Sequence, residues 1–228
     1  MVTGLFVCLL MLIRQSRLHS ISYKILFEAT VYAGFSGVIG ANLLYVFVNY
    51  QNLTIAQMLD PTTGHMFFGF FIFFVFTIII YGKIKNIPAM HIANVSIVAW
   101  ASAQCVALFA CLFAGCCYGK STDITWAITF VHESSRSPIG IPLHPTQIYD
   151  IVAVFLIMLV LVYMENIPQY SSYLFLIYML LYSLSRIILD NFRGDARGTI
   201  YDLITVSQGI AIIVLVLSFL LFLFRKNL

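Results

Sequence analysis

The end of one long apolar run carries two arginines and an aspartate at spacings that suit phosphate binding. Arg186 and Asp190 are four residues apart, so in a helix they share a face and can pair, and Arg193 follows one further turn along. Two guanidiniums held by one carboxylate form a planar clamp suited to a phosphodiester. The alternative is a pair of arginines that reach from a helix end to the membrane surface. Because Arg186 lies two turns inside the boundary, we favour phosphate binding for it, and both interpretations stay open for Arg193.

A second polar group opens another long apolar run. The string HPTQIYD starts at His144, and its proline followed by threonine is typical of a helix start. The first turn of such a helix has free backbone N–H groups, which favour an anion such as a lipid phosphate. Gln147 and Tyr149 are therefore candidate phosphate-binding residues. The alternative is an interfacial cap, with Tyr149 in an aromatic belt and Asp150 complementing the helix dipole.

The remaining polar and small residues favour packing over chemistry. The string GCCYGKSTD contains the adjacent cysteines Cys116 and Cys117, which lack the usual metal-ligand spacing and have no histidine nearby. We interpret both as small packing residues and expect no metal. The segment from Tyr32 to Asn42 carries small residues on one helix face, which also indicates helix packing. His65, before another apolar run, is either a base or an interfacial histidine.

The elements that must position these residues are membrane helices. Of the 228 residues, 61% are apolar and only 9% are charged, whereas a soluble domain is about a quarter charged. We expect an all-α membrane protein, a polytopic bundle of about seven transmembrane helices in one transmembrane domain over residues 1–228. Nucleic acid is not an expected partner, because the net charge of +3 is small and the basic residues form no stripe. The expected spans are 2–13 (short or partly re-entrant), 26–48, 66–82, 89–114, 147–164, 170–190 and 202–224.

The distribution of basic residues predicts an orientation. With the N-terminus outside, the inner loops hold seven of the twelve basic residues: Arg14, Arg17, Lys24, Lys83, Lys85, Arg225 and Lys226. The outer side keeps five: Lys120, Arg136, Arg186, Arg193 and Arg197. An excess of positive charge marks the cytoplasmic side, so we expect the N-terminus outside and the C-terminus in the cytoplasm. The mixed polar cluster then lies toward the outer face, where polar groups at membrane depth indicate a functional site.

Five strings, in the same order and at compatible spacing, resemble those of the prolipoprotein diacylglyceryl transferase family. They are residues 32–45, GCCYGKSTD, HPTQIYD, the Arg186 to Arg193 helix end and the TVSQ string from Thr205 to Gln208. The resemblance implies a seven-helix enzyme of the bacterial inner membrane. Such an enzyme moves a diacylglyceryl group from phosphatidylglycerol to the lipobox cysteine of a prolipoprotein, on the outer face and without a cofactor.

The chain also departs from the pattern of the family. Where the family reads G-R-x-G-N-F-x-N, this chain reads ALFACLFA from Ala107 to Ala114, so the essential arginine and both asparagines of the family are absent. Cys116 replaces an acidic residue, Asn42 stands at the arginine of the second helix, and Phe68 stands where a histidine or tyrosine is usual. His65, one turn before Phe68, is a candidate substitute.

These observations lead to one preferred function and two rivals. In the preferred one, Arg186 and Arg193 hold the lipid phosphate with Gln147, Tyr149 and Asn42, Asp190 orients the arginines, and His144 or His65 accepts the proton of the acceptor. The acceptor is a prolipoprotein cysteine or, in a closely related transfer, another group. The first rival is a non-catalytic lipid-binding membrane protein that retains the fold. The second, a small transporter, has less support because the sequence shows no internal repeat or paired broken helices.

Overall fold

The protein is almost entirely helical. The structure, a computed structural model, describes residues 2–60, 64, 66–195, 199–200 and 203–226. The main helices are α1 (Val2–Leu18), α2 (Tyr23–Asn49), α4 (Phe67–Lys85), α5 (Ala89–Ala114), α6 (Thr146–Glu165), α8 (Leu174–Leu189) and α9 (Val206–Lys226). Shorter elements are α3 (Ile55–Leu59), α7 (Pro168–Ser171), η1 (Tyr50–Asn52), η2 (Asp190–Phe192), β1 (Ile128–Thr129), β2 (Pro142–Leu143), β3 (Thr199–Ile200) and β4 (Ile204–Thr205). The chain forms two compact units, one of residues 12–96 and one of residues 1–11 with 97–228.

The helix lengths confirm an all-α polytopic membrane protein. Within the described residues, six helices are long and apolar enough to cross a membrane: α2, α4, α5, α6, α8 and α9. Helix α1 has 17 residues, at the lower limit of the roughly 17 to 25 that a bilayer requires. The expectation of about seven spans therefore corresponds to these six helices and the shorter α1.

Three helix ends differ from the sequence-based spans by four residues or more. Helix α1 continues through Arg14 and ends at Leu18, with Arg17 in the last turn, where a cation complements the helix dipole. Helix α8 begins only at Leu174, because Pro168 opens the separate short helix α7. Helix α9 begins at Val206, directly after the short antiparallel pair β3–β4, and not at 202, which lies outside the described residues.

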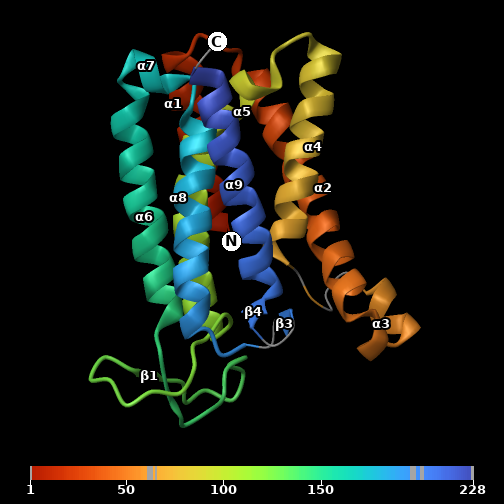
Figure 1. The fold of residues 1–228 in the computed structure, drawn as a ribbon, viewed down its shortest axis with the longest axis vertical. Helices are drawn as coiled ribbons and strands as arrows, with labels where there is room; N and C mark the ends of the chain where they lie inside the picture. The colour runs from red at the N-terminus through yellow and green to blue at the C-terminus, as the bar shows by residue number, and fades with distance from the viewer. Residues whose placement is uncertain (1, 61–63, 65, 196–198, 201–202, 227–228) are drawn as a thin grey trace. The chain divides into compact units, whose positions relative to one another are not determined.

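In the unit of residues 12–96, α2 and α4 lie side by side (Figure 1). Glycines permit their close approach: a Cβ atom on Gly40 would lie 2.4 Å from the ring of Phe73 and 2.5 Å from the carbonyl oxygen of Gly69. The hydroxyl groups of Ser36 and Thr77 are hydrogen-bonded across the contact at 2.6 Å. The predicted packing role of the small residues between Tyr32 and Asn42 is confirmed.

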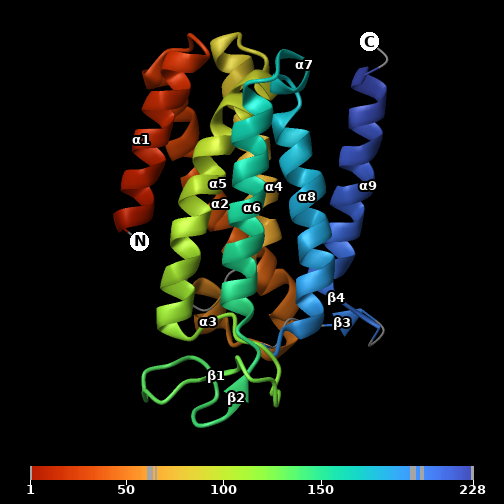
Figure 2. The same ribbon diagram turned by 90° about the vertical axis from the view of Figure 1, so that its left-hand side faces the viewer.

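In the other unit, α8 packs against α6 and against α9, and the polar loop that follows α5 lies beyond the helix ends (Figure 2). This loop contains the antiparallel pair β1–β2, in which Ile128 is opposite Leu143. It is also joined to the end of α8, because the N–H of Lys120 donates to Phe192 O at 2.9 Å and the N–H of Gly194 donates to Tyr118 O at 3.0 Å. The loop thus meets the ends of α6 and α8, where the polar residues gather.

Candidate active site

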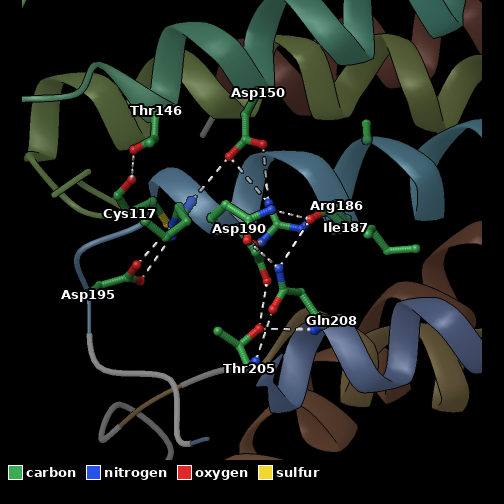
Figure 3. Close-up of polar contacts among 12 residues, drawn as sticks. Cys117, Thr146, Asp150, Arg186, Ile187, Asp190, Asp195, Thr205 and Gln208 are labelled. Carbon is green, nitrogen blue, oxygen red and sulfur yellow. Dashed lines mark hydrogen bonds and ion pairs between the residues drawn. The ribbon is translucent and has the colours of Figure 1, made fainter. Parts of the chain in front are cut away.

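The centre of the site is one carboxylate shared by two guanidinium groups. Asp150, in the second turn of α6, accepts from Arg186 Nη1 at 3.1 Å and from Arg193 Nη1 at 3.1 Å (Figure 3). All three side chains are less than a tenth exposed. These short hydrogen bonds join opposite charges, which offsets the free-energy cost of burying the carboxylate and the two guanidiniums. The shared carboxylate that we expected at Asp190 is therefore supplied by Asp150, which the sequence suggested only as a helix cap.

Asp190, one turn after Arg186, binds the guanidinium of Arg186 and links it to the start of helix α9. The predicted i, i+4 pair is confirmed, since Arg186 Nη2 donates to Asp190 Oδ1. The second carboxylate oxygen of Asp190 accepts from Thr205 Oγ1 at 3.2 Å. The hydroxyl oxygen of Thr205 accepts in turn from the N–H of Gln208 at 3.0 Å, and Gln208 Oε1 accepts from the N–H of Thr205 at 3.0 Å. This reciprocal cap fixes the start of α9 against the arginine pair.

Arg193 makes a second, bidentate ion pair. Its Nε and Nη2 each lie 2.9 Å from an oxygen of Asp195. Burial disfavours the charged guanidinium, but the hydrogen-bonded and neighbouring carboxylates outweigh it, so the pKa of Arg193 is raised above its usual value. Two fixed positive charges are therefore surrounded by the three carboxylates of Asp150, Asp190 and Asp195.

The start of α6 fixes the turn that follows α5. Thr146 Oγ1 donates to Cys117 O at 2.7 Å, and Gln147 Nε2 donates to Cys116 O at 2.8 Å. Gln147 is 1% exposed, so its contact in this structure is with the protein backbone. The pKa of the Cys117 thiol is lowered by hydrogen bonds with Cys111 and Cys116 and by the positive charge of Arg193.

His144 and Tyr149 form an aromatic group at the same helix start. His144 Nδ1 lies 3.4 Å from the hydroxyl oxygen of Tyr149, which also accepts from Trp126 Nε1 at 2.9 Å. The rings of His144 and Phe192 meet edge to face with centroids 5.2 Å apart. Because Phe192 precedes Arg193, the half-buried His144 lies beside the helix end that carries the arginine pair.

The other predicted site residues do not belong to this group of described contacts. Asn42 is in the unit of residues 12–96, where its Nδ2 donates to Gly64 O at 3.3 Å and so holds the segment before α4. His65 lies outside the described residues. A phosphate-binding role for Asn42 and a base role for His65 stay predictions.

The position of Asp150 on the apolar face of α6 could have identified it as a site residue. From Gln147 onward the buried side chains of this helix recur at intervals of three and four residues: Gln147, Asp150, Val154, Ile157, Leu161 and Glu165. A charged residue on the same face as three aliphatic core residues cannot face solvent, so it requires a buried partner. The additional partners Asp195, Thr205 and Cys117 come from other segments, and no spacing within one helix identifies them.

Comparisons with known proteins identify the family of this chain. The family model for prolipoprotein diacylglyceryl transferase matches residues 1–224. The chain is 27% identical to the phosphatidylglycerol–prolipoprotein diacylglyceryl transferase of Clostridium tetani, over 96% of this chain and 88% of that protein. It is 28% identical to the second such transferase of Clostridium perfringens, over 98% and 88%, and 25% identical to that of Finegoldia magna, over 92% and 82%. The chain therefore belongs to the prolipoprotein diacylglyceryl transferase family.

Proposed function

We propose that this protein transfers the diacylglyceryl group of phosphatidylglycerol to the lipobox cysteine of a prolipoprotein, at the outer face of a bacterial inner membrane. The family and the names of the relatives support this reaction. The observation that carries the proposal is the buried pair Arg186 and Arg193, held side by side by Asp150. Paired guanidiniums at a helix end are suited to bind a lipid phosphate. An arginine that only anchors a helix at the membrane surface needs no buried partner, so the anchor role does not explain this arrangement.

The reaction places new negative charge where the arginines are. The acceptor sulfur attacks the glycerol carbon of the diacylglyceryl group, and the bond from that carbon to the phosphate oxygen breaks. The electron pair leaves with glycerol phosphate, and the thiol proton passes to a base, for which His144 and His65 are the candidates. Fixed guanidinium donors stabilise the developing charge on the leaving phosphate, and a nearby positive charge also favours the acceptor thiolate.

Phosphate binding requires guanidinium donors that the carboxylates now occupy. Asp195 is the most accessible of the three carboxylates, with 24% of its side chain exposed against 9% for Asp150 and 0% for Asp190. The lipid phosphate therefore replaces Asp195 on the fork of Arg193, one bidentate anion for another. Asp150 stays in place between the two guanidiniums and Asp190 stays on Arg186, so Arg193 supplies the bidentate contact and Arg186 a neighbouring fixed charge.

A direct assay distinguishes the proposed function from its rivals. Purified protein is supplied with phosphatidylglycerol radiolabelled in the headgroup, with and without a lipobox peptide. We expect release of glycerol phosphate only with the peptide, together with a diacylglyceryl-modified peptide. Release with a different thiol or hydroxyl acceptor would indicate the related transfer. Phospholipid binding with no release under any condition would leave the non-catalytic lipid-binding protein, which the comparisons do not favour.

The orientation is part of the proposal. The excess of lysine and arginine in the loops that would face the cytoplasm supports an N-terminus outside and a C-terminus inside. In that orientation the polar end of the unit that contains the arginine pair faces outward, where a translocated prolipoprotein presents its cysteine. Phosphatidylglycerol and a prolipoprotein signal peptide are then the proposed partners.

A further inference from the structure

Three thiol groups converge at the end of α5. The sulfur atoms of Cys111, Cys116 and Cys117 all lie within 4.8 Å of one another, and this is the one such group of potential metal ligands that the described part of the chain contains. Cys111 lies five residues before Cys116 and within helix α5, so sequence spacing alone does not group it with the adjacent pair. From this convergence we infer that Cys111, Cys116 and Cys117 form a three-sulfur site for Cu(I), a function separate from lipid transfer.

The dimensions of the cluster suit a three-coordinate ion. Metal–sulfur bonds to thiolates are about 2.3 Å long, so three sulfurs around one ion lie about 4.0 Å apart in a planar trigonal arrangement. The three sulfurs therefore need to approach by less than about 1 Å from the observed upper limit of 4.8 Å. Soft thiolate ligands select Cu(I), whereas structural Zn²⁺ sites almost always take four ligands.

The backbone that presents the thiols is fixed on several sides. The N–H of Cys116 donates to Cys111 O at 3.2 Å, which closes the helix end. Gly115 has a φ of +65° and Cys117 a φ of +61°, the left-handed conformation that a cysteine rarely adopts without a cost in free energy. The carbonyl groups of Cys116 and Cys117 are each held by a side chain of α6. The turn is thus preorganised, and its left-handed conformation accompanies the close approach of the Cys117 sulfur to those of the other two residues.

Positive charges next to the cluster offset the charge of bound thiolates. Three thiolates around a monovalent ion carry a net negative charge, which is costly in a partly buried site without a counter-charge. The positive charges of Arg193 and Arg136 favour the thiolate forms of Cys117 and Cys116, respectively. The Arg136 backbone N–H also donates to Ala114 O at 3.2 Å, which keeps this residue at the helix end.

The test uses the full-length protein in detergent, reduced and under anaerobic conditions. Cu(I) is supplied from a chromophoric chelator, so that its transfer to the protein is read from the loss of colour. We expect one Cu(I) per chain, and X-ray absorption of the copper-loaded wild type should give three sulfur neighbours. A copper environment with fewer than three sulfurs, or no uptake from the chelator, would overturn the site without any reference to lipid transfer.

Variants assign the binding to the three cysteines. The matched control is the double variant Cys8→Ala/Cys105→Ala, which removes the two buried cysteines that are not part of the cluster. It should bind as the wild type does, whereas Cys116→Ser should bind at least about tenfold more weakly and the triple serine variant not at all. Circular dichroism and thermal unfolding confirm that each variant is folded. Full binding by the folded triple variant would contradict the inference.

Discussion

Asp150 and Arg193 are 43 residues apart in the chain, yet the carboxylate of one accepts from the guanidinium of the other at 3.1 Å in a buried position. The same carboxylate also holds Arg186. The start of α6 and the end of α8 are therefore joined by one side chain, and the spacing of the two guanidiniums depends on it. A phosphate held by Arg193 beside the fixed charge of Arg186 requires that spacing, so Asp150 is a positioning residue for the proposed reaction.

Replacement of Asp150 should harm both stability and transfer. Asp150→Asn leaves two buried guanidiniums without their shared counter-charge, and removal of one partner of a buried ion pair costs about 3–5 kcal/mol. Displacement of the arginines by about 1 Å is enough to reduce transfer about a hundredfold. Thermal unfolding in detergent and the peptide transfer assay measure the two effects. The exposed Asp123→Asn is the matched control and should resemble the wild type; an equally stable and active Asp150→Asn would show that the bridge is dispensable.

Gly194 sets the contact between the loop after α5 and the residue next to Arg193. A Cβ atom there would lie 2.5 Å from Gly119 O and 2.9 Å from Lys120 N, which are backbone atoms that cannot rotate away. Gly194→Ala should therefore push the segments apart, at about 1–3 kcal/mol, and lower transfer about tenfold or more. The control is Gly34→Ala in α2, where a Cβ atom meets nothing within 4 Å. Equal activities of the two variants would argue against the close contact.

Asp195 is expected to compete with the lipid phosphate for Arg193. Asp195→Asn removes the negative charge from a partly exposed ion pair, so the guanidinium fork becomes easier to occupy. The KM for phosphatidylglycerol should fall about two- to fivefold, the size of an ion pair of this kind, with kcat little changed. Steady-state kinetics in mixed micelles of varied phosphatidylglycerol content give both values. A raised KM would mean that Asp195 supports the bound lipid and does not compete with it.

The proposed orientation is tested by the access of a membrane-impermeant thiol reagent to introduced cysteines. Cysteines placed beside Arg14 and Lys83 should react only in inverted vesicles or permeabilised cells. Those beside Lys120 and His144 should react in intact spheroplasts. The protein without an introduced cysteine gives the background from its five native thiols. Reaction beside Lys83 and His144 from the same side of the membrane would overturn the orientation.

The features of the fold and of the site that follow from local spacing were predictable. The Arg186 and Asp190 pair follows from an i, i+4 interval, and the close packing of α2 on α4 follows from small residues on one face. The bridge from Asp150 depends on how α6 packs against α8, which no interval within either helix encodes. A charged residue on the apolar face of α6 predicts that some buried partner exists, but does not identify it.

The thiol cluster likewise could not be predicted from the spacing of residues in the sequence. Spacing rules for metal ligands describe residues on regular elements or in known loops, and adjacent cysteines fail them. The left-handed conformation of Gly115 and Cys117 turns the chain back on itself, so that Cys111 in the helix meets the pair beyond it. Such a turn is set by contacts with α6, so the sequence alone favoured a packing role.

Above all, the proposed function requires that the guanidinium of Arg186, held by Asp150 and Asp190, lie beside Arg193 and stabilise the charge of the lipid phosphate. The most direct test is the rate of diacylglyceryl transfer from phosphatidylglycerol to a lipobox peptide by Arg186→Lys, with the exposed Arg17→Lys as the control. Lysine keeps the charge but cannot bind Asp150 and Asp190 through separate planar donors, so the charge is misplaced and the loss should be about 2–4 kcal/mol of transition-state stabilisation, or about 30- to 900-fold in rate. The control should transfer at the wild-type rate. A folded Arg186→Lys protein with a rate within about threefold of the wild type, less than 1 kcal/mol, would contradict the claim and leave Arg186 as a structural anchor.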